Sequence, residues 1–109
     1  MKFNRELLKG NLQTIILAVL NDQPCHGYAM QKKILDKSAG IFELSEGTLY
    51  PTLHKLEKEG AIISVRLERD KMPPLRVYSL TARGKEILHN SRREWNYFSH
   101  GMSIILSSI

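Results

Sequence analysis

Cysteine is almost absent from this chain of 109 residues, in which Cys25 is the only one. A single cysteine excludes a disulfide within the chain, and a reducing cytoplasm is the simplest environment for it. Long apolar runs are also lacking. The runs at residues 15–20 and 104–106 are far shorter than the about 20 apolar residues of a membrane-spanning helix. The mixed charges before the first run do not resemble a signal peptide, so we expect a cytoplasmic protein that does not cross a membrane.

The motifs of common catalytic sites are missing too. There is no glycine-rich phosphate loop, no nucleophile elbow and no zinc motif. Cys25 and His26 are adjacent, but His54, His89 and His100 are scattered and show no metal-ligand spacing. We expect neither an enzyme nor a cofactor, and we expect His26 to cap a helix. A metal or redox sensor that uses Cys25 and His26 stays as an alternative.

What the chain does have is a positive charge. Sixteen Lys and Arg residues against eleven Asp and Glu residues give a formal net charge of +5. A basic surface attracts polyanions, nucleic acid first and anionic membranes second. Many soluble proteins are mildly basic, however, so charge alone is a weak indication. The length suits one domain with a modest core, which oligomerisation would help to stabilise.

Apolar periodicity predicts two helices in the first third of the chain. Apolar residues recur at helical spacing from about residue 5 to residue 21. Pro24 then favours a turn, because proline discourages continuation of a helix. A second helix is predicted from about residue 26 to residue 37.

The segment Leu44–Gly60, LSEGTLYPTLHKLEKEG, predicts a third helix with a clear start and end. Ser45 is a good N-cap and Gly60 a good stop signal. Three leucines at positions 49, 53 and 56 form one inward stripe. The proline within the segment removes one helical hydrogen bond, so the helix is expected to bend there. The outer face carries polar, hydrogen-bonding side chains, namely Thr48, Tyr50, His54, Lys55 and Lys58.

The pattern changes after Gly60. Residues 62–68 alternate with a period of two, which is typical of a strand, and residues 75–80 are predicted as a second strand after a turn at 69–74. Two strands alone are marginal, so this hairpin must pack on the helices. Three helices followed by a hairpin predict a winged helix-turn-helix DNA-binding domain over residues 1–80, in which the third helix enters the major groove. The fold class is mostly α with a small β-hairpin (α+β).

The last segment, residues 81–109, is predicted as one long dimerisation helix capped by Thr81. Residues 88, 95, 102 and 109 are seven apart, and residues 91, 98 and 105 form the interleaved set of a coiled-coil seam. Five of these are the predicted dimer contacts, namely Leu88, Trp95, Phe98, Met102 and Ile105. The alternative is a helix packed on its own domain. We favour a homodimer, because a two-fold pair presents two recognition helices to a two-fold operator in double-stranded DNA.

Four segments carry a resemblance to a known family. They are LLKGNLQTIILAVL at residues 7–20, HGYAM at 26–30, LSEGTLYPTLHKLEKEG at 44–60 and PPLRVYSLTARG at 73–84. The chain resembles the PadR-like transcriptional regulators, named for control of phenolic acid decarboxylase, from residue 7 to about residue 105. The pairing of HGY with EGTLYP at this spacing is far more specific than a general helix-turn-helix signal.

The resemblance implies a homodimeric winged-helix repressor that reads DNA with its third helix and wing. In such regulators the C-terminal helix exchanges against the N-terminal helix of the other subunit. The short C-terminal region resembles the subfamily with a single dimerisation helix, some members of which bind flat aromatic molecules in a pore at the dimer centre. A tryptophan from each subunit then stacks on the ligand, and Trp95 falls at that position.

The wing departs from the family pattern. Many relatives carry a glycine pair followed by PPRKYYRLT. Here Leu75, Val77 and Ser79 replace the expected Arg, Tyr and Arg, and Arg76 stands where lysine is common. The wing therefore has fewer cations than the pattern, and we expect a smaller wing contribution to DNA affinity.

The DNA-binding candidates come from three segments. They are Tyr28 and Lys32 in the second helix, Ser45, Thr48, Tyr50, His54 and Lys55 in the third, and Arg69, Lys71 and Arg76 in the wing. The start of the third helix suits a phosphate, while Thr48 and His54 are placed to reach base edges. The alternatives are burial for Tyr28 and Tyr50 and simple solvation for the wing cations.

An effector site is predicted around Trp95. Its candidate residues are Leu7, Asn11, Thr14, Ser91, Trp95 and Ser99. A planar aromatic molecule between two indoles would gain stacking and burial. The alternatives are a tryptophan buried in the core, and a winged-helix protein-interaction module without an effector.

Overall fold

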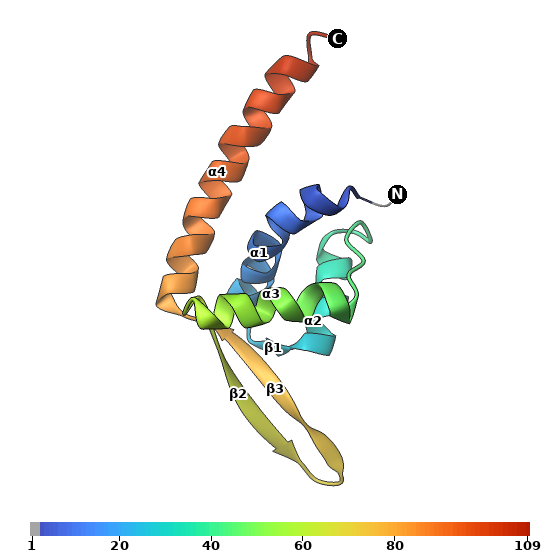
Figure 1. Cartoon of the computed structure of the whole chain (residues 1–109), viewed down its shortest axis with the longest axis vertical. Coiled ribbons are helices and arrows are strands. Elements are labelled where there is room, and N and C mark those ends of the chain that lie inside the picture. The colour runs from blue at the N-terminus through green and yellow to red at the C-terminus, as the bar shows by residue number, and fades with distance from the viewer. Residues whose placement is uncertain (1–2) are drawn as a thin grey trace.

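The computed structural model describes residues 3–109, within which four helices and three strands form (Figure 1). Residues 1 and 2, the start of the predicted DNA-binding domain, lie outside the described part. The elements are α1 (Arg5–Asp22), β1 (Cys25–His26), α2 (Gly27–Lys37), α3 (Glu46–Lys58), β2 (Ile62–Arg69), β3 (Met72–Leu80) and α4 (Ala82–Leu106). The first three helices form a body from which the β2–β3 hairpin and α4 extend in opposite directions, and the molecule measures 59 × 31 × 21 Å.

Three side chains cap helix N-termini as predicted. The Ser45 hydroxyl accepts from the Thr48 backbone N–H at 3.2 Å, and His26 Nδ1 accepts from the Ala29 N–H at 3.3 Å. The Thr81 hydroxyl accepts from the Gly84 N–H at 3.0 Å. Each bond satisfies a donor that has no partner within its own helix. The predicted starts of α2, α3 and α4 are therefore confirmed.

The core lies where α1, α2 and α3 meet the base of the sheet. Its largest fully buried side chains are Ile16 and Leu17 of α1, Met30 and Ile34 of α2, Leu49, Leu53 and Leu56 of α3, and Ile62 of β2. The predicted leucine stripe of α3 is confirmed. The helix continues through Pro51 without interruption. Burial of this stripe holds α3 on one side and leaves its opposite face outward.

The sheet differs from the predicted hairpin in two ways. Its strand order is β1-β3-β2, all antiparallel, so a short strand at Cys25–His26 pairs with Tyr78 and Val77 of β3. A strand of two residues has no periodicity from which it could be predicted. The turn predicted at residues 69–74 is present but shorter, because Arg69 pairs with Met72 and only residues 70 and 71 lie between the strands. Pro73 and Pro74 stand at the register shift between Leu67 and Arg69, where neither β2 nor β1 supplies them a paired residue, so their missing N–H groups break no ladder bond.

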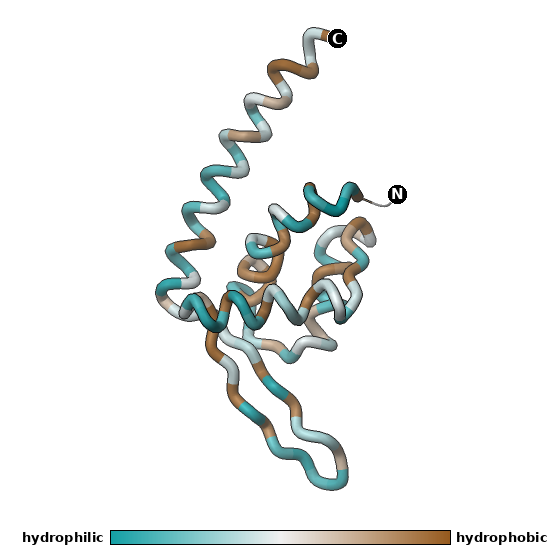
Figure 2. The backbone as a smooth tube through the Cα atoms, viewed as in Figure 1, coloured by the Kyte–Doolittle hydropathy of each residue, from teal (hydrophilic) through white to brown (hydrophobic). Residues whose placement is uncertain are grey.

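The helix α4 is long but ends at Leu106, so the heptad position Ile109 lies beyond the helix. Only Gly84 of this helix is buried in the single chain. Figure 2 shows apolar bands that recur along α4 toward the C-terminal end. An amphipathic helix with its apolar residues uncovered needs something to pack against.

Candidate nucleic-acid interface and effector pocket

The outer face of α3 presents polar side chains in a row. His54 and Lys55 are exposed, and Thr48 is half-buried near the start of the helix. The Ser45 and Thr48 hydroxyls lie 3.0 Å apart, so the first turn carries two hydroxyls beside free backbone N–H groups. This arrangement suits phosphate at the helix start and base edges along the helix.

The two candidate tyrosines differ from one another in burial. Tyr28 is 72% exposed, which contradicts the alternative of a buried core tyrosine, and Lys32 is exposed one turn further along α2. Tyr50 is half-buried and packs against the core. A Cβ on Gly27 would lie 2.5 Å from the Tyr50 hydroxyl oxygen. Tyr50 therefore packs against the start of α2, as its burial alternative stated, and its contact with DNA stays a prediction.

The three wing candidates occupy different positions. Arg69 donates from Nε and Nη2 to the Pro73 carbonyl, at 2.9 and 2.6 Å, and so closes the turn. Lys71 is exposed at the tip and adopts a positive φ of 58°. Arg76 is exposed and donates to the Ser64 hydroxyl. Of the three candidates, Arg69 is therefore bound within the turn, whereas Lys71 and Arg76 make no hydrogen bond to it.

Arg66 is a wing cation absent from the predicted set. It pairs directly across the hairpin with Arg76, and its Nε lies 2.6 Å from a Glu68 carboxylate oxygen. The period of two placed Arg66 on the same strand face as Ser64, so the signal was present in the sequence. The opposite face of β2 is apolar and more than half exposed, through Ile63, Val65 and Leu67.

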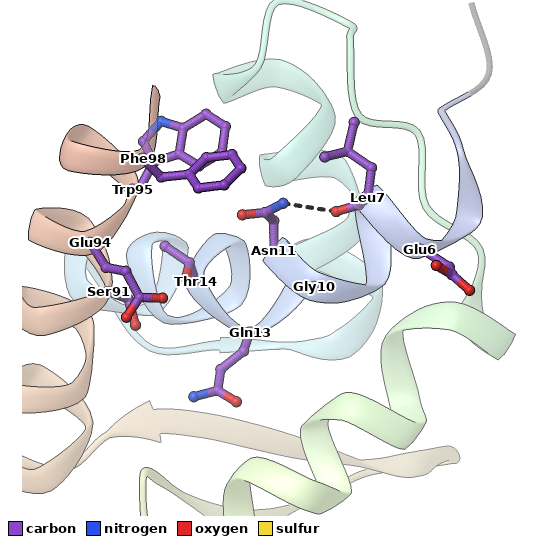
Figure 3. Close-up of a pocket in the computed structure, with 10 residues that line it drawn as sticks. All are labelled: Glu6, Leu7, Gly10, Asn11, Gln13, Thr14, Ser91, Glu94, Trp95 and Phe98. Carbon is purple, nitrogen blue, oxygen red and sulfur yellow. Dashed lines mark hydrogen bonds between the residues drawn. The ribbon is translucent and has the colours of Figure 1, made fainter. Parts of the chain in front are cut away.

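Two hollows lie beside α1 and share Trp95 of α4, and Figure 3 draws the residues that line the larger of them. The larger, of about 410 Å³, is lined by Glu6, Leu7, Gly10, Asn11, Gln13, Thr14, Ser91, Glu94, Trp95 and Phe98. The second, of about 340 Å³, is lined by Phe3, Leu7, Leu8, Asn11, Thr14, Ile15, Phe42 and Trp95. Five of the six predicted effector residues are brought together here.

Ser99 is the exception, because it lines neither hollow and its hydroxyl donates to the Asn96 carbonyl at 3.2 Å. Trp95 is 46% exposed, so the alternative of a buried core tryptophan is wrong for the single chain. Phe98 lies beside it, with ring centroids 6.2 Å apart. Its place one turn after Trp95 on α4 was the signal for this neighbour.

The charge of the pocket is one-sided. Glu6 and Glu94 line the larger hollow, and among residues 3–109 no Lys, Arg or His lines either of the two. The Asn11 side-chain amide donates to the Leu7 carbonyl at 2.8 Å, which fixes its orientation on α1 (Figure 3). The walls are therefore aromatic and amide surfaces with carboxylates at the edge.

The predicted dimer contacts separate into two groups. Trp95, Phe98, Met102 and Ile105 are between 43% and 69% exposed. Leu88 is half-buried and packs against the core of its own domain, because α4 leaves the body only beyond its first turns. Leu88 therefore follows the packed-helix alternative, while the later positions form an uncovered apolar seam.

The Cys25 thiol is buried, and burial raises its pKa, although the positive charge of Lys33 acts in the opposite direction. A raised pKa disfavours the reactive thiolate. Within residues 3–109 no group of three His, Cys, Asp or Glu side chains lies close enough to hold a metal ion. Among the same residues, no helix combines the length and apolar character that a bilayer crossing requires.

Comparison with known proteins shows what this chain is similar to. The family model described as the Transcriptional regulator PadR-like family matches residues 16–90. The transcriptional regulator Rv3488 of Mycobacterium tuberculosis is 34% identical over 82% of this chain and 79% of its own length.

Solved structures agree. A transcriptional regulator from Clostridium thermocellum superposes with a TM-score of 0.85 and 26% identity, covering 94% of this chain and 96% of that one. The structure of Bacillus subtilis PadR in complex with operator DNA superposes with a TM-score of 0.67 and 26% identity, covering 72% of this chain and 45% of that one. The chain belongs to the PadR-like family of transcriptional regulators, a winged-helix family of DNA-binding proteins and not of enzymes.

Proposed function

We propose that this chain is a cytoplasmic, homodimeric transcriptional repressor that binds a two-fold operator. The observation that carries the proposal is the outer face of α3, where an N-capped helix presents Thr48, His54 and Lys55 away from a fully buried leucine stripe. A polar, cationic helix held rigidly on one side suits the major groove. The solved complex of Bacillus subtilis PadR with operator DNA supports this use of the fold.

The uncovered seam of α4 supports the homodimer. The seam exposes the large apolar side chains of Trp95, Phe98 and Met102 in the single chain. A contiguous apolar patch of this kind on a soluble protein marks an interaction site. A second copy that packs its α4 against this seam and against α1 would cover these side chains. The same arrangement would place two α3 helices on one side of the dimer, as a two-fold operator requires.

The hollows beside Trp95 support a planar aromatic effector. The seam and the effector site share Trp95 and Phe98, so an effector would bind where the two subunits meet. It would relieve repression by changing the spacing of the two reading helices, provided that it binds the two spacings with different affinity. A winged-helix interaction module without an effector is the alternative, and it requires neither DNA binding nor Trp95 quenching.

The DNA proposal is tested with the inverted repeat nearest to the protein's own gene. Binding of the full chain to this duplex is measured at several salt concentrations for wild type, His54→Ala and Lys55→Ala. Both variants should weaken binding, and Lys55→Ala should reduce the salt slope by about one if it contacts a phosphate. Lys85→Ala removes an equal charge at the start of α4 and is the control. Unchanged affinity in both α3 variants would contradict the assignment of α3 as the reading helix.

A further inference from the structure

Three side chains join α3 to the base of the wing. The Ser64 hydroxyl of β2 donates to Glu57 Oε2 of α3 at 2.5 Å, and Arg76 Nη1 of β3 donates to the same hydroxyl oxygen at 2.9 Å. A carboxylate only accepts and a guanidinium only donates, so the hydroxyl must donate to the first and accept from the second. The two hydrogen bonds therefore form a chain from the Arg76 guanidinium through the Ser64 hydroxyl to the Glu57 carboxylate, with a charged group at each end.

The strand register shows why Arg76 needs such a partner. Arg76 and Arg66 are direct cross-strand neighbours, and Ser64 and Tyr78 are the next pair on this face toward the body. Like charges directly opposite each other on a sheet are destabilising. Glu68 binds Arg66 on the outer side, while Glu57 reaches Arg76 through Ser64 on the inner side. Each guanidinium is therefore held by a different carboxylate.

Burial distinguishes the two carboxylates. Glu57 and Ser64 are half-buried at the junction of α3 and the sheet, whereas Glu68 and Arg66 are exposed. Partial burial weakens the screening of a charge by solvent, so the link through Glu57 is the more persistent of the two. The negative charge of Glu57 also raises the pKa of the buried Tyr78 hydroxyl, second to the effect of burial itself.

The Glu57 carboxylate is unexpected on a helix that is proposed to bind DNA. Glu57 belongs to the helix proposed to meet DNA, and a negative charge there repels phosphate. By itself it would lower DNA affinity. A long arginine side chain, however, loses rotamer freedom when it binds, and a partner that orders it beforehand reduces that cost.

We propose that Glu57 is a positioning residue for DNA binding. Through Ser64 it holds the Arg76 guanidinium and the base of the wing in a fixed relation to α3. The reading helix and the wing then meet the duplex as one rigid unit. This inference rests on the proposed function and on the predicted contact of Arg76 with DNA, a contact that Glu57 itself does not make.

The test uses the full chain and operator duplex with four variants, Glu57→Ala, Glu57→Gln, Ser64→Ala and Arg76→Ala. Ordering of one arginine corresponds to a loss of about 2- to 10-fold in affinity for Glu57→Ala and Ser64→Ala. Glu57→Gln should keep the affinity for DNA near that of wild type, because the glutamine amide oxygen can still accept from the Ser64 hydroxyl. Glu59→Ala removes an exposed carboxylate at the end of the same helix and should leave binding unchanged or tighter.

Two further readouts keep the result separate from a folding defect. In a double-mutant cycle, Ser64→Ala should add little to Arg76→Ala, since both remove the same contact. NMR of the arginine Nε–H groups in the free protein should show Arg76 ordered in wild type and mobile in Ser64→Ala. Both readouts come from protein whose cooperative unfolding is checked first.

The outcomes are distinguishable. If Arg76→Ala weakens binding but Glu57→Ala and Ser64→Ala behave like Glu59→Ala, the positioning role is wrong and the proposed function stands. Full additivity in the cycle overturns the positioning role in the same way. If Arg76→Ala leaves both affinity and salt slope unchanged, the predicted contact of the wing with DNA is wrong and this inference fails with it, whereas the proposed role of α3 stands.

Discussion

Gly84 at the start of α4 lies directly against the carbonyl oxygen of Ala61, so a Cβ at position 84 would overlap that oxygen. The same oxygen accepts from the Thr81 N–H at 3.1 Å, and the Thr81 hydroxyl shares its proton between the carbonyl oxygens of Gly60, at 2.7 Å, and Ala61, at 2.9 Å. The Thr81 hydroxyl also caps α4. One carbonyl after α3 thus sets where α4 begins and in which direction it leaves the body.

Replacing Gly84 by alanine should therefore destabilise the protein, because the neighbour that must move is backbone. We expect a loss of about 1–3 kcal/mol in the free energy of unfolding, the usual range for overpacking. Thermal or denaturant unfolding of the full chain measures it. Gly101→Ala is the matched control, since position 101 lies in the same helix with nothing within 4 Å, and alanine there should stabilise by about 0.5–1 kcal/mol. Equal melting temperatures for the two variants would contradict the packing described.

A charge in the α4 seam should separate the proposed dimer. Phe98→Glu places a carboxylate in the surface that the second copy would cover, and burial of an unpaired charge is strongly unfavourable. Sedimentation or light scattering at micromolar concentration should then report a monomer. Tyr97→Glu changes the neighbouring aromatic residue, which is 84% exposed and lines neither hollow beside Trp95, and should leave the dimer intact. A dimer that survives Phe98→Glu would show that α4 is not its interface.

Ligand charge should matter at the pocket beside Trp95. Glu6 and Glu94 line it, and no basic residue in the described part of the chain does, so a flat aromatic cation should quench Trp95 fluorescence at lower concentration than an anion of similar size. Glu94→Gln should narrow that difference without abolishing quenching by a neutral ligand. Trp95 is the only tryptophan, so the signal is unambiguous. An absence of quenching across cationic, neutral and anionic aromatics, with operator binding intact, would contradict the effector proposal.

Stability should fall at alkaline pH through Tyr78. Burial, together with the charges of Glu57 and Tyr50, raises the pKa of this hydroxyl above its ordinary value of 10.0. Above pH 10 the unfolded chain therefore releases a proton that the folded protein keeps. The stabilisation is complete below the unfolded pKa and is lost as pH rises through the folded one. The free energy of unfolding, measured from pH 8 to 11, should decline less steeply with pH for Tyr78→Phe than for wild type. Identical slopes would contradict the raised pKa of Tyr78.

Local chemistry was sufficient for much of this fold. The helix starts could be predicted from Ser45, His26 and Thr81, because each side chain can accept a hydrogen bond from a free backbone N–H three residues later. The leucines of α3 and the period of two after Gly60 identify an inward helix stripe and a strand for the same reason, namely that burial follows the repeat of the backbone. The resemblance paired the last helix with the first helix of the other subunit, whereas the hollow beside Trp95 is lined by α1 and α4 of one chain, so the predicted effector residues stay a prediction.

Contacts between separate elements had no such local signal. Only packing in three dimensions places Tyr50 against Gly27 and β1 beside β3. It also packs Leu88 against the core of its own chain. The bonds from Glu57 through Ser64 to Arg76 join three elements in the same way. Periodicity shows which face of an element is buried, but not which residue of another element meets it, because that depends on how the helices and the sheet fill the shared core.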